Sequence, residues 1–222
     1  MDKIEIYHGS KEVVKTPLFN IGKPYNDYGR GFYCTQDFEL AKEWACKTQD
    51  DGFVNIYELD TCDLNILDLS SNEYNVLHWI AILLKNRKFA IKNPIEISAY
   101  NYILDNFLID YSEYDVIIGY RADDSYFSYA QSFLSNTISI STLKRAIMLG
   151  NLGKQFVLIS EKAYENIKFI KSVNVDKNIY HEKYVVRDKN ARMKYSEVVK
   201  NQGFSKGDIF ILDMLREANN EY

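Results

Sequence analysis

The sequence YGRGFYCT at residues 28–35 places two glycines around an arginine, directly before a short aromatic run. Glycine accepts backbone conformations and close approaches that a side chain would block, so this pattern predicts a tight bend beside a pocket. The run FYCT at residues 32–35 predicts a short strand. Residues 37–47 follow with acidic residues in the first turn and apolar residues at helical spacing, which predicts a helix.

A second strand precedes this segment and ends in a polar corner. Ile4, Ile6 and His8 alternate with Lys3, Glu5 and Tyr7, the period-two pattern of a half-buried strand, and Gly9 and Ser10 follow. Residues 11–28 lack periodicity and contain Pro, Gly and Asn, so we expect a loop over the surface. The two predicted strands and the glycine bend between them are the part of the chain around which we expect the fold to be organised.

The remaining segments alternate between strand and helix patterns. Strands are predicted at residues 53–59, 64–69, 116–118, 155–159 and 167–175, of which the first two are candidates for a hairpin around residues 60–63. Helices are predicted at residues 74–86, 94–106, 125–135, 141–149, from 160 onwards for a short stretch, and at 208–218, after a highly charged stretch at 180–201. This order predicts an α+β fold, with a body at residues 1–175 and a helical C-terminal extension at residues 176–222.

Composition limits the class of protein. The net charge of −4 gives no nucleic-acid footprint across the whole chain, and the 18 tyrosines are compatible with packing or with stacking. Cys34, Cys46 and Cys62 have no metal-ligand spacing and are expected to be reduced structural thiols, with no metal bound. No signal peptide is visible, and the apolar run at residues 76–84 is too short to span a bilayer. We therefore expect a soluble cytoplasmic protein that does not enter a membrane.

Several motifs together resemble a known enzyme superfamily. Residues 7–10 (YHGS), 29–35 (GRGFYCT), Ala41 and residues 44–45 look like the first two motifs of the ADP-ribosyltransferase superfamily, in its poly(ADP-ribose)-polymerase-like branch. The stretch to about Ile170, including IGYRADD at residues 118–124, also resembles the bacterial DUF3990 family. The resemblance covers most of the chain. It implies a split β-sandwich around a cleft for NAD, which would be the substrate.

The resemblance also implies roles for individual residues. It places His8 on the ribose of the adenosine side, Gly9 on the nicotinamide amide, Tyr33 against the nicotinamide ring and Trp44 as a second ring. The chemistry is reasonable, because an imidazole can bond a ribose hydroxyl and a glycine backbone can pair with a carboxamide. The remaining residues of the implied NAD site are Ser10, Arg30, Gly31 and Arg121.

Each assignment has a structural alternative. A histidine at a strand end is often simply hydrogen-bonded, Tyr33 and Trp44 could be core residues, and Arg30 could be a solvated turn charge. Ala41 departs from the pattern, since many relatives have a serine there to bond the carboxamide. The combination of His8 and Tyr33 with their neighbours favours the functional interpretation.

The third motif differs from the superfamily. Relatives usually carry a glutamate on a later strand, but the best candidate here is Gln155; Glu161 lies past the strand end and is more simply a first-turn helix acid. Glutamine can bond a ribose hydroxyl but brings no charge to stabilise a cationic transition state and cannot act as a base. We therefore expect a triad of His8, Tyr33 and Gln155, with another carboxylate assisting or with low activity.

That carboxylate has candidates at the end of the strand at residues 116–118. Arg121, Asp123, Asp124 and Tyr126 could hold a pyrophosphate or orient an acceptor there. Alternatively, the two aspartates only cap the following helix.

The expected function is that of an NAD-dependent mono-ADP-ribosyltransferase acting on a macromolecular acceptor, either protein or nucleic acid. Families of this kind often look like toxins of toxin–antitoxin or phage-defence systems, which implies a small antitoxin protein that contacts the tail beyond Asp176. The alternatives are a catalytically degenerate NAD-binding or interaction module and an NAD glycohydrolase. The sequence has no P-loop, no Rossmann fingerprint and no nucleophile elbow to suggest other chemistry.

Overall fold

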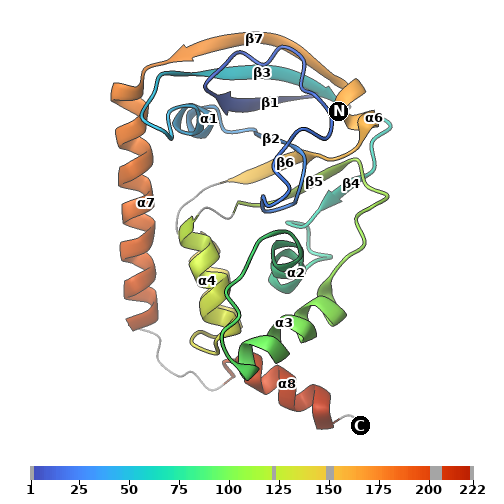
Figure 1. The fold of residues 1–222 in the computed structure, drawn as a ribbon, viewed down its shortest axis with the longest axis vertical. Coiled ribbons are helices and arrows are strands. Elements are labelled where there is room, and N and C mark those ends of the chain that lie inside the picture. Colours follow the sequence, from blue (N-terminus) through green and yellow to red (C-terminus); the bar gives the residue numbers. More distant parts are fainter. Residues whose placement is uncertain (1–2, 122–123, 149–152, 201–206, 221–222) are drawn as a thin grey trace.

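A computed structural model describes residues 3–121, 124–148, 153–200 and 207–220 of the chain. Within these ranges the fold is a mixed α+β arrangement of one sheet and eight helices, as the sequence predicts (Figure 1). The sheet has seven strands in the order β4-β5-β6-β2-β1-β3-β7: β1 Lys3–Ser10, β2 Phe32–Thr35, β3 Gly52–Asp60, β4 Ile66–Asp68, β5 Val116–Tyr120, β6 Lys154–Leu158 and β7 Ile167–Val175. The helices are α1 Phe38–Ala45, α2 Val76–Asn86, α3 Pro94–Phe107, α4 Asp124–Leu134, α5 Ile140–Met148, α6 Glu161–Glu165, α7 Lys177–Lys200 and α8 Ile211–Asn220.

The sheet consists of two halves that meet at a narrow junction. β1, β3 and β7 are paired along most of their length, and so are β2, β6 and β5. Between the halves, β1 and β2 are paired at Tyr7 and Thr35. Figure 1 shows β7, β3 and β1 in the upper half and β6, β5 and β4 in the lower half. Beyond the Tyr7–Thr35 pair the two strands separate, so side chains of both can face a common space.

Helix α2 forms the centre of the core beneath the lower half of the sheet. Eight of its residues are buried, and they pack with Leu67, Ile117 and Val157 of the sheet. A helix that is apolar on nearly all sides is stable only when it is buried. Asn75 caps its first turn by accepting a hydrogen bond from the backbone N–H of Leu77. Across the described ranges, no helix is both long enough and apolar enough to cross a bilayer.

The hairpin expected around residues 60–63 does not form. β4 forms one edge of the sheet, with four strands between it and β3, and pairs in parallel with β5. The physical reason is that β3 is already hydrogen-bonded on both edges, to β1 and to β7, and has no free edge for β4. The turn signal marked a real change of direction, but the chain then crosses to the other half of the sheet.

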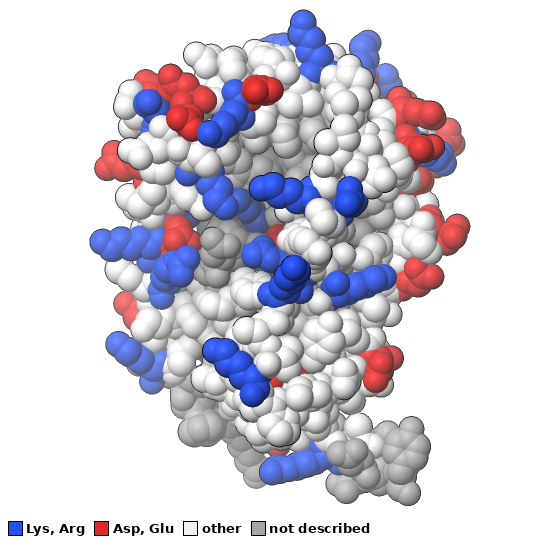
Figure 2. All heavy atoms as spheres, viewed as in Figure 1, with Lys and Arg blue, Asp and Glu red and all other residues white. Residues whose placement is uncertain are grey.

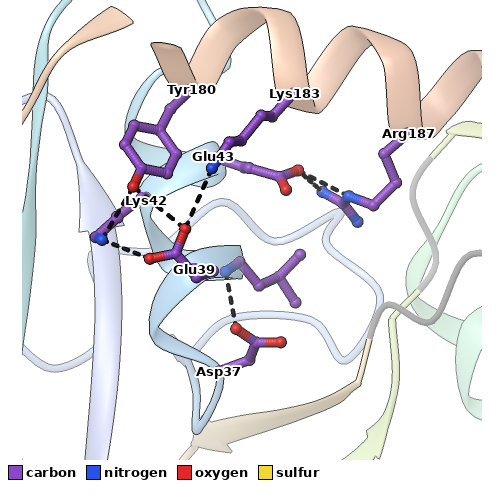
Figure 3. Close-up of polar contacts among 8 residues, drawn as sticks. Asp37, Glu39, Lys42, Glu43, Tyr180, Lys183 and Arg187 are labelled. Carbon is purple, nitrogen blue, oxygen red and sulfur yellow. Dashed lines mark hydrogen bonds and ion pairs between the residues drawn. The ribbon is translucent and has the colours of Figure 1, made fainter.

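Helix α7 is attached to the body by polar contacts along α1, as Figure 3 shows. The Arg187 guanidinium binds the Glu43 carboxylate, with 2.7 Å between Nε and Oε2. One turn away, Tyr180 and Lys183 contact the Glu39 carboxylate. Only Ala191 of α7 is buried among the described residues, which explains why the sequence of this stretch is highly charged. These contacts hold α1 from outside while its other face packs on β1 and β3.

Candidate active site

A cavity of about 760 Å³ opens where the two halves of the sheet separate. Its volume falls in the range typical of sites for small molecules and cofactors. The loop at residues 11–31 forms one wall, and strands β1, β2 and β6 and helix α1 form the others. Of the residues singled out in the sequence, the cavity brings together His8, Gly31, Tyr33, Trp44, Arg121 and Gln155.

His8 holds the junction together and has one ring nitrogen to spare. Its Nδ1 lies 2.7 Å from the backbone carbonyl oxygen of Tyr33. A carbonyl oxygen can only accept, so Nδ1 carries the hydrogen and the Nε2 lone pair is left to accept another bond. Burial lowers the pKa of His8, which favours this neutral form, and the ring packs against Phe32 with 4.4 Å between centroids. His8 is therefore a neutral hydrogen-bond acceptor at the cavity.

Tyr33 presents its ring, and not its hydroxyl, to the cavity. The hydroxyl donates to the Gly29 carbonyl at 2.7 Å and accepts from the Tyr28 backbone N–H at 3.1 Å. Gly29 has a φ of 76°, a left-handed conformation that glycine adopts at little cost, so the bend predicted from the G-R-G pattern is present. Burial strongly raises the pKa of Tyr33 and keeps it protonated. With its polar group used inside the protein, Tyr33 can offer a ligand only an aromatic face.

Gln155 lies beside a buried carboxylate that the sequence analysis did not identify. The Gln155 side chain is only 4% exposed, and its Nε2 lies 3.5 Å from Oδ2 of Asp27. Asp27 also binds Nη1 of Arg87 at 2.7 Å. An ionised carboxylate only accepts hydrogen bonds, so the amide nitrogen faces Asp27 and fixes the orientation of the amide.

The other end of that amide lacks a partner. Oε1 of Gln155 is buried and forms no hydrogen bond with any described residue. Buried polar atoms are nearly always hydrogen-bonded, so this acceptor beside the cavity is available to a donor on a bound molecule, water included. A sugar hydroxyl is a suitable donor.

Trp44 and Arg121 form a second polar corner of the cavity. The Arg121 guanidinium lies 4.2 Å from the centroid of the Trp44 ring, the geometry of a cation–π contact. Nε1 of Trp44 is buried and has no hydrogen-bond partner in the described parts of the chain. This corner therefore combines a positive charge, an aromatic ring and an unpaired donor, which together suit an anionic or carbonyl group of a ligand.

Three of the expected binding residues lie outside the cavity lining. A Cβ on Gly9 would lie 2.1 Å from the Ala41 carbonyl oxygen, so this glycine is required for packing against α1. The Ser10 hydroxyl donates to the Glu12 carbonyl and positions the start of the loop. Arg30 is exposed. It donates to the backbone carbonyl oxygen of Asn20 at 3.0 Å across the same loop.

The expected acceptor residues are described only in part. Asp123 lies outside the described residues. Asp124 begins helix α4, and Tyr126 lies in its first turn, but their side chains are not among those described.

Sequence reasoning missed the Asp27–Arg87 pair and the contribution of the loop at residues 11–31 to the cavity wall. Asp27 lies 60 residues from Arg87 and 128 from Gln155 along the chain, so no local spacing connects them. In the sequence Asp27 looks like an ordinary turn residue before Gly29. The loop residues Pro17, Leu18 and Ile21 also line the cavity, although the sequence indicated only a surface loop.

The cavity offers several different kinds of group to a ligand. Among the described residues no cluster of His, Cys, Asp or Glu could hold a metal ion, and the three cysteines are unpaired thiols. Two neutral acceptors, on His8 and Gln155, match hydroxyl groups. The Tyr33 ring matches a planar base, and Arg121 matches a phosphate.

Comparison with known proteins gives one match. A family model described as "Protein of unknown function (DUF3990)" matches residues 4–169. Every residue that lines the cavity falls within this range. No curated protein and no solved structure matches the chain.

Proposed function

Since the chain belongs to the DUF3990 family, through a range that includes every residue lining the cavity, we propose that it is an NAD-dependent mono-ADP-ribosyltransferase that modifies a macromolecular acceptor. The observation that carries this proposal is the meeting of His8, Tyr33 and Gln155 at one cavity, from three different strands. The unpaired Oε1 of Gln155 and Nε1 of Trp44 add a hydrogen-bond acceptor and donor at the same place.

The fold supports the same proposal. A sheet whose halves separate beyond the pair of Tyr7 and Thr35 has the form expected of an ADP-ribosyltransferase-like split β-sandwich. The cavity opens at this separation, and the residues assigned to NAD lie on both sides of it, with His8 on β1 and Tyr33 on β2.

The resemblance to ADP-ribosyltransferases implies a role for each of these cavity residues, and their hydrogen bonds leave free the group that each role needs. Nε2 of His8 accepts a hydrogen bond from a hydroxyl of the adenosine ribose. The Tyr33 ring stacks on the nicotinamide, and Oε1 of Gln155 accepts from a hydroxyl of the nicotinamide ribose. We assign the charge of Arg121, which also lines the cavity, to the pyrophosphate.

In the reaction, the bond between the nicotinamide nitrogen and C1′ of the ribose breaks, and both electrons leave with neutral nicotinamide. A lone pair of the acceptor forms the new bond to C1′, and the acceptor releases one proton to solvent. Positive charge develops on the ribose as the bond breaks, and the Gln155 oxygen, as the negative end of an amide dipole, stabilises it. Asp27 orients this dipole, and Arg87 balances much of the negative charge of Asp27. We therefore assign Asp27 a positioning role.

The proposal also includes a role as a toxin with a small antitoxin protein as its partner. The antitoxin would contact the extension beyond Asp176. Helix α7 supports it because Val185, Val186 and Met193 are exposed apolar residues on an otherwise charged helix. Apolar side chains that face solvent on a helix are common in surfaces that bind other proteins. Co-purification of the chain with the product of the neighbouring gene, and its loss in a Val185→Glu/Met193→Glu variant, would test this part separately.

The test of the enzymatic proposal uses NAD labelled in its ADP moiety and a cell extract. The wild-type protein should transfer label to macromolecules and release nicotinamide, and His8→Ala and Tyr33→Ala should abolish both. Lys189→Ala is a matched control, because this exposed residue on α7 is not among the residues that line the cavity.

The other outcomes identify the alternatives. Free ADP-ribose without labelled macromolecule would show an NAD glycohydrolase. Thermal protection by NAD without any turnover would show a binding module. Full activity in both His8→Ala and Tyr33→Ala would contradict the site assignment.

A further inference from the structure

Exposed basic side chains lie in or directly next to the segments that line the cavity. We use the term basic rim for Lys15, Lys23, Arg30, Lys47 and Lys88, all of which are exposed. Lys47 lines the cavity, and each of the others is a chain neighbour of a lining residue. The basic rim thus combines cations from the loop at residues 11–31, from the end of α1 and from the end of α2.

The five cations of the basic rim outnumber the acidic residues that line the cavity, which are Glu12 and the Arg87-paired Asp27. Within the described ranges none of its five members forms an ion pair with a carboxylate, whereas Lys11 on the same loop is paired with Asp50. Figure 2 shows Lys and Arg spread over the middle of this face around a hollow, with most Asp and Glu towards its edges. The whole chain carries a net charge of −4, so this face is basic against the overall balance. Such a local field attracts polyanions.

Exposed aromatic rings are interleaved with these cations. Phe19 is 41% exposed and Tyr25 is 59% exposed, both on the loop that forms the cavity wall. Nζ of Lys88 lies 4.4 Å from the centroid of the Tyr25 ring. Phe19 packs edge-on against Tyr164, a residue of the cavity lining, with 5.5 Å between centroids. Cations along a groove with rings between them are the features that bind single-stranded nucleic acid.

We propose that the basic rim binds a single-stranded nucleic acid and presents it to the cavity as the acceptor of ADP-ribose. Phosphates contact the lysines, and bases stack on Tyr25 and Phe19. A protein partner is disfavoured because the cores of protein interfaces are depleted in lysine, whereas lysines make up four of the five residues of the basic rim. The acceptor role rests on the proposed function, but binding of the strand does not.

The transfer step needs no further reactant. An exocyclic amino nitrogen or a hydroxyl of the strand donates its lone pair to C1′ of the ribose, the bond from C1′ to nicotinamide breaks, and neutral nicotinamide leaves with both electrons. The nucleophilic atom then loses its proton to solvent. The strand must be single because a base within a duplex is stacked and paired and cannot reach into a cavity.

The binding test is a fluorescence anisotropy titration with a labelled single strand of mixed sequence, about 15 nucleotides long. It is run with a DNA strand and with an RNA strand, both without NAD. The mouth variant Lys15→Glu/Lys23→Glu/Lys88→Glu leaves out every residue assigned to NAD. Its control, Lys168→Glu/Lys171→Glu/Lys189→Glu, makes the same charge change on exposed residues of β7 and α7.

We expect the Kd of the mouth variant to rise at least about tenfold, and that of the control to change by no more than about threefold. The slope of log K against log salt should become shallower by about 2 in the mouth variant, since each lost phosphate contact removes about 0.7 for a single strand. Tyr25→Ala should weaken binding by about tenfold at unchanged salt slope, because it removes stacking and no charge.

The outcomes separate this proposal from the proposed function. No binding of either strand, equal losses in the two triple variants, or label from NAD appearing only in protease-sensitive material would overturn it. The last result would leave the transferase intact with a protein as its acceptor. Binding that depends on the basic rim, with no release of nicotinamide, would confirm the nucleic-acid surface and refute the transferase. Label on the strand itself would support both.

Discussion

The amide nitrogen of Gln155 lies 3.5 Å from a carboxylate oxygen of Asp27, although the two residues are 128 positions apart. This contact turns Oε1 of Gln155, which has no partner among the described residues, away from Asp27. The carboxylate is itself held by Arg87, at 2.7 Å. A neutral residue at the position of an expected glutamate is thus supported by a negative charge directly behind it.

The first prediction concerns this contact. Asp27→Asn should lower kcat for nicotinamide release about tenfold, because an asparagine no longer fixes the orientation of the Gln155 amide. The KM for NAD should change less than kcat, since the other contacts with NAD remain. Steady-state kinetics would measure both, and a thermal melt would show that the variant is folded. A fall in melting temperature with unchanged kcat would mean that Asp27 is only structural.

Exchanging the two side chains gives a sharper prediction. Gln155→Glu alone should not raise activity at neutral pH, because a second carboxyl group beside Asp27 has a raised pKa and stays protonated. The double variant Asp27→Asn/Gln155→Glu keeps one carboxylate and one amide but places the charge on the cavity side. It should be more active than Gln155→Glu. Equal activity of the two variants would show that the residues do not act as a pair.

Tyr33 allows its two roles to be separated. Tyr33→Phe removes the bonds to Gly29 and Tyr28 but keeps the ring, so it should lower the free energy of unfolding by about 1–2 kcal/mol while NAD still binds. Tyr33→Ala, in contrast, removes the ring as well and should abolish NAD binding. Urea denaturation and NAD titration of both variants would check this. Loss of NAD binding in Tyr33→Phe as well would assign the hydroxyl, and not the ring, to the ligand.

His8 predicts a pH dependence of stability. Its pKa in the folded protein is lowered from 6.5 by burial, so the unfolded chain binds the proton more readily than the folded chain. The contribution of His8 is therefore fully present above pH 6.5 and is lost as the pH falls from 6.5 towards the lowered value. Between about pH 7.5 and about pH 5.5, wild type should lose more unfolding free energy than His8→Gln. Equal losses of unfolding free energy in the two proteins would contradict the lowered pKa of His8.

The ion pair between α7 and α1 predicts a stability effect remote from the cavity. Arg187 and Glu43 are only 20% and 12% exposed, so Arg187→Ala leaves a largely buried carboxylate without its partner. We expect a loss of about 3 kcal/mol in the free energy of unfolding, measured by urea denaturation. Lys189→Ala, an exposed residue on the same helix, should change it by no more than about 0.5 kcal/mol. Similar effects of the two substitutions would show that the pair does not anchor α7.

Local patterns predicted most of the secondary structure. The bounds of β2 and β7 agree with the sequence because alternating or aromatic runs are enclosed there by turn residues. Helix α3 begins at Pro94, as predicted, since proline is favoured in the first turn. The placement of β4 failed because it depends on which strand edges are free, and that is a property of the whole sheet.

The site was predictable in part for the same reason. His8 and Tyr33 carry a local signature, and the structure places both at the cavity. Asp27 and Arg87 carry none, since their significance comes only from contact with Gln155 and with each other. The basic rim could not be seen either, because its cations are spread over residues 15–88 and become neighbours only when the loop folds over the cavity.

The central claim is that the cavity between β1, β2 and β6 binds NAD, and isothermal titration calorimetry with NAD tests it most directly. The wild-type protein should bind NAD at one site with a Kd between about 1 μM and about 1 mM, the usual range for an enzyme and its substrate. Tyr33→Ala and His8→Ala should show no binding in the same range, and Lys189→Ala should bind as the wild type does. No heat of binding with the wild-type protein, or equal binding by all four proteins, would contradict the account.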